Sequence, residues 1–250
     1  FILMDIIESS QDIQNSLLAW FRENGRNWIP WKLKQDGSIP KSGEKISPYG
    51  IWIAEVMLQQ TQLKVVIPYW EKWMKTFPSL TNLVEADLQN IYLIWQGLGY
   101  YSRAKRIHQS SKILIEYIGQ TRVEEPDSWP VLIDQWITLP GIGRSTAGSI
   151  ISSAFDLPTP ILDGNVKRIF SRLLANDITS SKDDKKFWEL SSILISTLNP
   201  RDFNQALMDL GAKICTPRKP ICYSCPLQKF CVAYVKYDPQ NFPKKEMKKV

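Results

Sequence analysis

Four cysteines lie within seventeen residues near the C-terminus, and the chain has no others. They are Cys215, Cys222, Cys225 and Cys231, spaced C-x₆-C-x₂-C-x₅-C. Thiolates gathered this closely form a set of soft ligands, which suits a metal centre. Any centre that binds all four must fix this segment in a tight loop. The array therefore constrains the fold more than any other feature of the sequence.

Several kinds of centre are compatible with this cysteine array. A structural zinc site usually pairs two C-x₂-C knuckles across a longer spacer, whereas this sequence has one C-x₂-C. Pro226 directly follows Cys225, like the Cys-Pro that ends many cubane-cluster motifs. Disulfides fit least, because nothing at the N-terminus resembles a secretory signal. The spacing favours an iron–sulfur cluster over zinc, and zinc over disulfides.

The charge balance favours a polyanionic partner. The net charge is +6, and residues 244–249 supply +3 of it through four lysines and one glutamate. Four cluster thiolates would reduce this excess, because a cubane with four thiolates carries about −2 overall. The remaining excess is modest and points to nucleic acid without requiring it. Apolar stretches such as 51–58 are too short to cross a bilayer.

The apolar pattern is helical nearly throughout. Ile13, Leu17, Leu18 and Phe21 share one helical face, with Gly25 as a stop signal. No stretch shows the sustained alternation of a strand, so the pattern predicts an all-α protein. The polar segment 32–47 is expected to be a flexible surface loop. Further helices are predicted at about 51–62, 64–76, 87–96, 101–118, 130–138, 144–155, 164–174, 183–197 and 201–213.

A second motif, L-P-G-I-G-R-S-T-A-G at 139–148, predicts two helices joined by a tight turn. Gly141 and Gly143 permit positive φ and close backbone approach. The helix that follows begins with unpaired N–H groups, which can bind a DNA phosphate without reading sequence. The alternative is an ordinary helical connector, and the motif alone does not decide between them.

Two carboxylates are candidates for proton chemistry. Glu55 is the only charge in the apolar segment 51–58, and on a helix it shares a face with Trp52, Leu58, Gln59 and Gln62. Partial desolvation there would raise its pKa toward neutrality. Read alone, a solvent-facing glutamate is the simpler interpretation.

Asp163 precedes a predicted helix in P-I-L-D-G-N-V, and its simplest role is that of an N-cap. A capping aspartate stays ionised, as an electrostatic stabiliser must.

Five segments in one order resemble the endonuclease III-like superfamily of helix-hairpin-helix DNA glycosylases that carry a [4Fe–4S] cluster, and most closely its MutY-type adenine DNA glycosylase branch. The resemblance covers about residues 10–235 and favours iron–sulfur over zinc. The segments are E-V-M-L-Q-Q-T-Q at 55–62, G-L-G-Y-Y-S-R-A at 97–104, L-P-G-I-G-R-S-T at 139–146, I-L-D-G-N-V-K-R at 161–168 and the cysteine array.

The resemblance implies two helical domains with the active cleft between them. A six-helix barrel containing the hairpin would span 48–158. Residues 1–47 and 159–235 would form the second domain with the cluster loop, and 236–250 a basic tail or linker. It also implies a monomeric DNA repair enzyme of the prokaryotic cytoplasm, associated with the nucleoid.

Ser145 indicates which branch of this family the chain resembles. The endonuclease III branch has a lysine at this position, whose amine attacks the sugar and forms a Schiff base. A serine cannot form that imine, so the resemblance implies a monofunctional glycosylase. Its substrate would be duplex DNA containing adenine opposite 8-oxoguanine or guanine.

The resemblance also implies residue roles. Glu55 would protonate the adenine, Asp163 would stabilise the oxocarbenium-like sugar, and Asn165 would orient Asp163 or the water. Gln60, Thr61 and Tyr100 would contact the lesion side, with the hairpin at Gly141, Gly143 and Ser145 on the backbone. Weaker candidates for the adenine pocket are Arg26, Trp31 and Gln205, and the cluster loop would place Lys213, Arg218 and Lys219 against phosphates.

The chain also departs from the family pattern. Lys32 stands where arginine is frequent, and the loop 32–47 is longer than usual. The chain opens with Phe1 and ends nineteen residues after Cys231, so we expect a piece of a longer protein without the Nudix-like domain that helps read 8-oxoguanine. Alternatives are a thymine- or uracil-mismatch or pyrimidine-specific glycosylase of the same fold, and a non-catalytic DNA-binding module.

Overall fold

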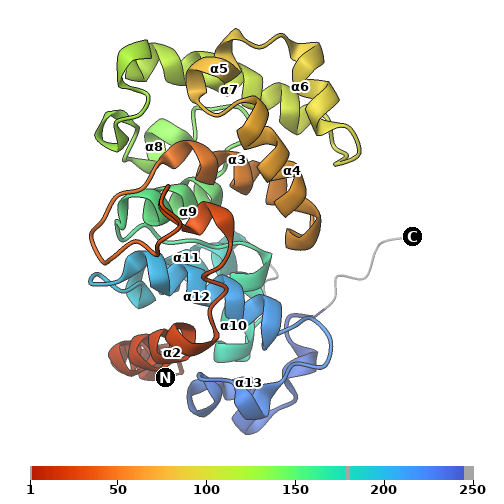
Figure 1. The fold of residues 1–250 in the computed structure, drawn as a ribbon. Helices are drawn as coiled ribbons and strands as arrows, with labels where there is room; N and C mark the ends of the chain where they lie inside the picture. Colours follow the sequence, from red (N-terminus) through yellow and green to blue (C-terminus); the bar gives the residue numbers. More distant parts are fainter. Residues whose placement is uncertain (1, 178–180, 245–250) are drawn as a thin grey trace. The chain divides into compact units, whose positions relative to one another are not determined.

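The structure is a computed structural model, and it describes residues 2–177 and 181–244. Helices account for its regular structure, and no strand occurs among these residues, so the predicted all-α class is confirmed (Figure 1). No helix in the described part combines the length and apolar character needed to cross a bilayer. The end of the predicted basic tail, 245–250, lies outside the described residues.

The chain divides into two compact units, one made of 1–26 and 158–250 and the other of 27–157. Residues 27–47 group with the second unit, although the sequence reading placed them with the first. The reason is backbone pairing, because Ile46 N–H donates to the Ala154 carbonyl at 2.8 Å. Gly43 N–H likewise donates to Asp156 Oδ2 at 2.7 Å. The loop expected to be flexible is thus anchored to the end of a helix.

In the 27–157 unit, helix α3 (Pro48–Leu58) is the central element. It packs against α4 (Leu63–Thr76), α7 (Ser102–Ile118) and α9 (Arg144–Phe155). Its apolar residues are buried nearly all round, which is typical of a core helix. Three shorter helices complete the unit: α5 (Leu80–Glu85), α6 (Leu88–Trp95) and α8 (Ile133–Trp136).

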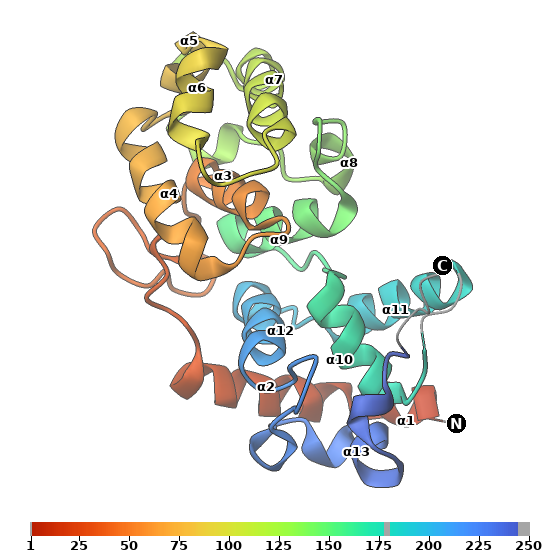
Figure 2. The ribbon, with the colours of Figure 1, turned by 90° about the vertical axis from the view of Figure 1, so that its right-hand side faces the viewer.

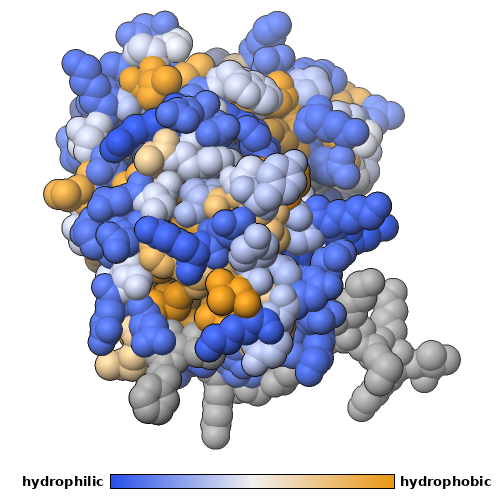
Figure 3. Space-filling model, turned by 90° about the horizontal axis from the view of Figure 1, so that it is seen from below, coloured by the Kyte–Doolittle hydropathy of each residue, from blue (hydrophilic) through white to orange (hydrophobic). Residues whose placement is uncertain are grey.

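The other unit is built on α12 (Pro200–Lys213), which packs against α2 (Ser10–Asn24) and α10 (Gly164–Leu174) (Figure 2). Helix α11 (Ser181–Leu194) contacts α2 and α1 (Ile2–Glu8), and α13 (Val232–Lys236) contacts α10. The predicted apolar face of α2 is confirmed, because Ile13, Leu17, Leu18 and Phe21 are all buried. The face in Figure 3 is mostly hydrophilic, with apolar residues confined to separate patches.

Candidate active site and cysteine pocket

Glu55 lies in the last two turns of α3 and is partly buried. The hydroxyl of Ser149, on α9, donates to Glu55 Oε1 at 2.9 Å. Because α3 and α9 pack together, this bond fixes the carboxylate relative to the hairpin helix. The expectation that Gln59 and Gln62 share the helical face of Glu55 was wrong, because the helix ends at Leu58.

The segment after α3 is a turn rather than the predicted helix continuation to residue 62. Gln60 has φ +59°, a left-handed conformation that a non-glycine residue rarely adopts. The side chain of Gln59 donates to the Gly141 carbonyl at 3.1 Å, which ties this turn to the hairpin. Gln60 is exposed and Thr61 partly buried.

Tyr100 lies in a second turn, between α6 and α7, and also has a positive φ, of +47°. Its side chain is 60% exposed. Tyr101 packs edge-on against Tyr92, at 5.9 Å between ring centroids. The two tyrosines therefore differ, since Tyr101 has an aromatic partner while Tyr100 projects outward.

The helical hairpin joins α8 to α9. Gly141 has φ +83°, and a Cβ there would lie 2.8 Å from Arg106 Cδ, so this position requires glycine. Gly143 is the N-cap of α9 and has open space around it. Ser145 lies in the first turn of α9.

Asp163 caps α10, as predicted from the sequence. Its Oδ1 accepts the backbone N–H of Val166 at 2.9 Å, and its Oδ2 accepts Asn165 Nδ2 at 3.3 Å. Burial raises the pKa of Asp163 above the ordinary aspartate value, against the opposing effect of these hydrogen bonds and of Arg168. The carboxylate is therefore fixed in direction and partly stripped of water.

Arg168 connects this carboxylate to the cysteine loop. Its Nη2 donates to Asn165 Oδ1 at 2.9 Å and to the Gly211 carbonyl at 2.9 Å. Its Nε donates to the carbonyl of Cys215 at 2.8 Å. A continuous path of hydrogen bonds thus runs from Cys215 through Arg168 and Asn165 to Asp163.

The candidates for the adenine pocket have structural partners. Arg26 donates from Nε to Oδ1 of Asp209 at 2.8 Å, and Asp209 is almost fully buried. Trp31, in the other unit, is 8% exposed and packs against Trp70 with ring centroids 5.5 Å apart. Gln205 is buried on α12.

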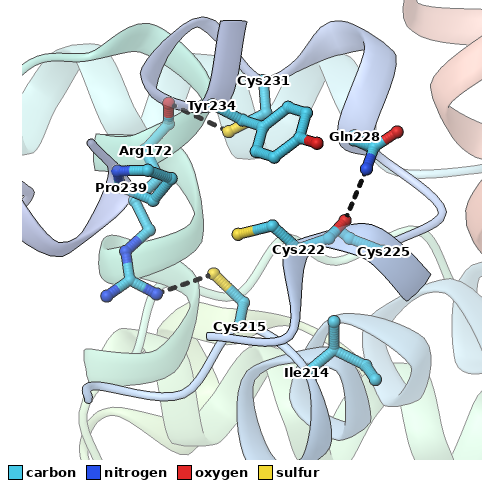
Figure 4. Close-up of a pocket in the computed structure, with 9 residues that line it drawn as sticks. All are labelled: Arg172, Ile214, Cys215, Cys222, Cys225, Gln228, Cys231, Tyr234 and Pro239. Atoms are coloured by element: carbon cyan, nitrogen blue, oxygen red, sulfur yellow. Dashed lines mark hydrogen bonds between the residues drawn. The ribbon is translucent and has the colours of Figure 1, made fainter. Parts of the chain in front are cut away.

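The four cysteines line one pocket, which encloses about 290 Å³ of space partly open to solvent (Figure 4). Arg172, from α10, donates from Nη1 to Cys215 Sγ at 3.2 Å, and its carbonyl accepts from Cys231 Sγ at 3.4 Å. All four are free thiols. No set of three or more described His, Cys, Asp or Glu side chains is close enough to hold a metal ion.

Burial is the main influence on the thiols. It raises the pKa of Cys225 to about 12 and that of Cys231 to about 11, and neighbouring cysteines add to the effect. A metal centre bound in the pocket would have the opposite effect and lower these pKa values, because the thiols lose their protons when they bind metal. Arg172 already supplies a buried positive charge beside Cys215.

The basic residues near this pocket have different surroundings. Lys213 donates to the Asn24 carbonyl at 2.6 Å and lies 5.9 Å from the Trp20 ring centroid. Arg218 and Lys219 lie in the exposed loop between the first two cysteines, and their carbonyls accept from Thr216 Oγ1 at 2.8 and 3.4 Å. Lys219 has φ +50°.

Four residues in these sites were not predicted from the sequence. They are Ser149, Arg168, Arg172 and Arg103, whose guanidinium donates to Gln59 and Thr61 in the turn after α3. Arg168 and Arg172 follow Asn165 at helical spacings of three and seven, which could have suggested one face. For Ser149 and Arg103 the sequence carries no comparable signal.

The chain is similar to known base excision DNA repair proteins. Residues 53–192 match the model of the HhH-GPD superfamily base excision DNA repair protein. An adenine DNA glycosylase of Buchnera aphidicola (subsp. Schizaphis graminum) is 40% identical over 236 residues, which is 94% of this chain and 63% of the relative. Those of Mus musculus and Homo sapiens are 39% and 37% identical over 88% of this chain, and over 41% and 39% of the relatives. The chain thus spans less than two thirds of each.

Solved structures support the same fold. The structure of a thermostable thymine-DNA glycosylase has a TM-score of 0.74 and 24% identity, covering 92% of this chain and 98% of that one. A non-covalent endonuclease III–DNA complex has a TM-score of 0.66 and 21% identity, covering 91% and 97%. The all-helical architecture, the hairpin and the family match agree. The chain belongs to the HhH-GPD superfamily of base excision DNA repair proteins.

Proposed function

We propose that this chain is a monofunctional adenine DNA glycosylase that hydrolyses the N-glycosidic bond of adenine mispaired with 8-oxoguanine or guanine. The observation that carries the proposal is the likeness to relatives of that activity, at 37–40% identity over 88–94% of the chain. A mispaired adenine must leave the base stack before its sugar bond can be reached.

Glu55 is the proposed proton donor. Adenine leaves poorly until a ring nitrogen is protonated, and a carboxyl held by Ser149 in one orientation can deliver that proton. After the base departs, the same carboxylate can accept a proton from water. The raised pKa expected for Glu55 remains a prediction.

Asp163 is the proposed stabiliser of the sugar cation. Its charge, fixed by Val166 N–H and Asn165, lies where hydrogen bonds prevent it from turning away. Either electrostatic stabilisation or a transient bond to the sugar would serve, as paired carboxylates do in glycoside hydrolysis.

The remaining roles concern DNA. The first turn of α9, with Gly143 and Ser145, offers backbone N–H groups to a phosphate. Exposed Gln60 and Tyr100 are proposed to face the base opposite adenine, with Thr61 beside them. Lys213, Arg218 and Lys219 are proposed phosphate contacts, although the ammonium of Lys213 also has a carbonyl partner.

The cysteine pocket is proposed to hold a [4Fe–4S] cluster. A single zinc ion needs its sulfurs about 2.3 Å from one point. Here four thiols border a pocket, which fits a centre that takes one thiolate at each of its irons. The bound cluster would cross-link the loop 215–231, and the hydrolytic steps belong to the carboxylates.

The test is a panel of duplexes carrying adenine opposite 8-oxoguanine, thymine opposite guanine, and thymine glycol, each incubated with and without alkali. We expect base release only from the duplex with adenine opposite 8-oxoguanine, and strand cleavage of that duplex only after alkali. Thymine release would favour the mismatch or pyrimidine alternatives, and specific binding without any base release would favour the DNA-binding module.

A further inference from the structure

Arg103 is a buried arginine that the proposed chemistry does not use. It lies in the first turn of α7, and its side chain is only 4% exposed. Burying a guanidinium is costly unless its donors find acceptors. The position of those acceptors therefore shows what the side chain holds in place.

One set of acceptors belongs to the end of α3 and the turn after it. Nη1 of Arg103 donates to the carbonyls of Val56, Met57 and Gln59 at 3.2, 2.6 and 2.5 Å. Nη2 donates to Thr61 Oγ1 at 3.1 Å. The last carbonyls of a helix lack partners within the helix and attract positive charge. Arg103 thus closes the C-terminus of α3 and holds the turn at 59–61.

The other set belongs to the turn between α6 and α7. Nη2 also faces the carbonyls of Leu98 and Gly99, at 3.4 and 3.2 Å. The guanidinium carbon lies 5.2 Å from the Trp95 ring centroid and 5.4 Å from that of Tyr100, within cation–π range. One planar group therefore holds two turns that are about forty residues apart in sequence.

Both turns contain a strained residue whose side chain is exposed. Gln60 and Tyr100 are non-glycine residues with φ of +59° and +47°. Such conformations persist only where the surroundings fix them. Arg103 contacts the residues on either side of Gln60, and its guanidinium lies against the ring of Tyr100.

We propose that Arg103 is a positioning residue that locks the two turns into one platform for the base opposite adenine. It does not touch the reacting atoms. The part of this proposal that concerns DNA rests on the proposed function. The part that concerns the two turns rests only on the contacts of Arg103 within the protein. Its loss weakens recognition of the mispair far more than the chemical step.

The test compares Arg103→Met, which keeps much of the apolar stem, with Arg103→Lys. Two controls accompany them. Ile107→Ala removes a buried contact one turn further along α7, so it reports general destabilisation of this helix. Arg122→Met removes an exposed arginine that pairs with Glu125.

The first measurement is hydrogen exchange of the DNA-free proteins. We expect faster exchange at 57–62 and 97–101 together in Arg103→Met, less in Arg103→Lys, and no such paired change in the controls. This measurement tests the coupling of the two turns by Arg103 even if the chain does not release adenine. Unchanged exchange at both turns in Arg103→Met would overturn the proposal.

The second measurement separates binding from chemistry. With a duplex of A:8-oxoguanine made uncleavable by a 2′-fluoro group on the adenosine, we expect Arg103→Met to raise Kd about tenfold and to lower the preference over an A:T duplex, since small misplacements of a contact surface are costly. The single-turnover rate at saturating enzyme should fall less than about threefold. Unchanged Kd and preference, or a loss confined to the single-turnover rate, would exclude a positioning role.

Discussion

At the scale of single residues, the proposed chemistry depends on two carboxylates that are held differently. Glu55 accepts from a serine hydroxyl, while Asp163 accepts a backbone N–H and an amide N–H. At Asp163 both donors stabilise the ionised form, but burial outweighs them and raises the pKa of this carboxyl.

Glu55→Gln and Asp163→Asn should each abolish adenine release while binding to mispaired DNA persists. Loss of a proton donor or of a charge that stabilises the transition state costs on the order of several kcal/mol in the barrier. Single-turnover release and Kd should be measured together, with exposed Glu116→Gln as a control. Substantial release by Glu55→Gln would place the acid elsewhere.

Asp163 should also make stability depend on pH. Its folded-state pKa is raised by burial, so ionisation costs folding free energy above that pKa. Asp163→Asn should therefore raise Tm at neutral pH. The gain should shrink as pH falls through the raised pKa, because the wild-type carboxyl is then protonated as well.

Thermal unfolding of Asp163→Asn and wild type between neutral pH and about pH 4, near the unperturbed pKa, checks this. Exposed Asp134→Asn serves as the control. A Tm gain that grows toward acid would mean that the hydrogen bonds, rather than burial, dominate at Asp163.

At the scale of elements, local signals fixed some boundaries well. The predicted ranges 144–155 and 164–174 match α9 and α10, because glycine and aspartate caps mark their starts. Helix α5 was missed because six residues are too few for a clear apolar period. The end of α3 was also missed, because its turn uses a left-handed glutamine and a distant arginine instead of a glycine.

The N-terminus of α9 leads to a prediction about strand cleavage. Ser145 cannot form an imine with an abasic sugar, so wild-type protein should leave an intact abasic strand. Ser145→Lys should introduce a covalent adduct that borohydride traps, whereas Thr146→Lys, which points to another side of the helix, should not. Efficient trapping of the wild type would contradict the monofunctional assignment.

At the scale of the whole molecule, the cysteine pocket lies in a unit assembled from both ends of the chain. Residues 1–26 contribute α2, which packs on α12, and Cys215 lies just after the C-cap of α12, Ile214. The sequence predicted the cysteine set, but not the grouping of 27–47 with the other unit, because that depends on backbone pairing with α9.

Protein purified without oxygen should contain iron and sulfide and absorb broadly near 400 nm, an approximate position for cubane clusters. Cys225→Ser should lower iron content and speed hydrogen exchange in 158–177 and 200–244, but leave 48–155 protected. Metal binding and folding are coupled where a site cross-links a loop. Stoichiometric zinc without iron would refute the cluster, and uniform loss of protection would mean that the units do not unfold separately.

Selectivity for the opposite base is the last property at this scale. The relatives are longer than the matched region, and within residues 1–250 the proposed contacts to that base come from Gln60, Thr61 and Tyr100. One or two hydrogen bonds to an oxidised base change binding by about 1–3 kcal/mol, or roughly ten- to a hundredfold in selectivity. We expect a polypeptide of residues 1–250 alone to have little of this selectivity. It should release adenine opposite guanine at a rate within about tenfold of that opposite 8-oxoguanine. Single-turnover rates and Kd on the two duplexes, with Tyr100→Leu as a comparison, measure it. A strong preference for 8-oxoguanine that disappears in Tyr100→Leu would instead locate the discrimination in the turn that Arg103 holds.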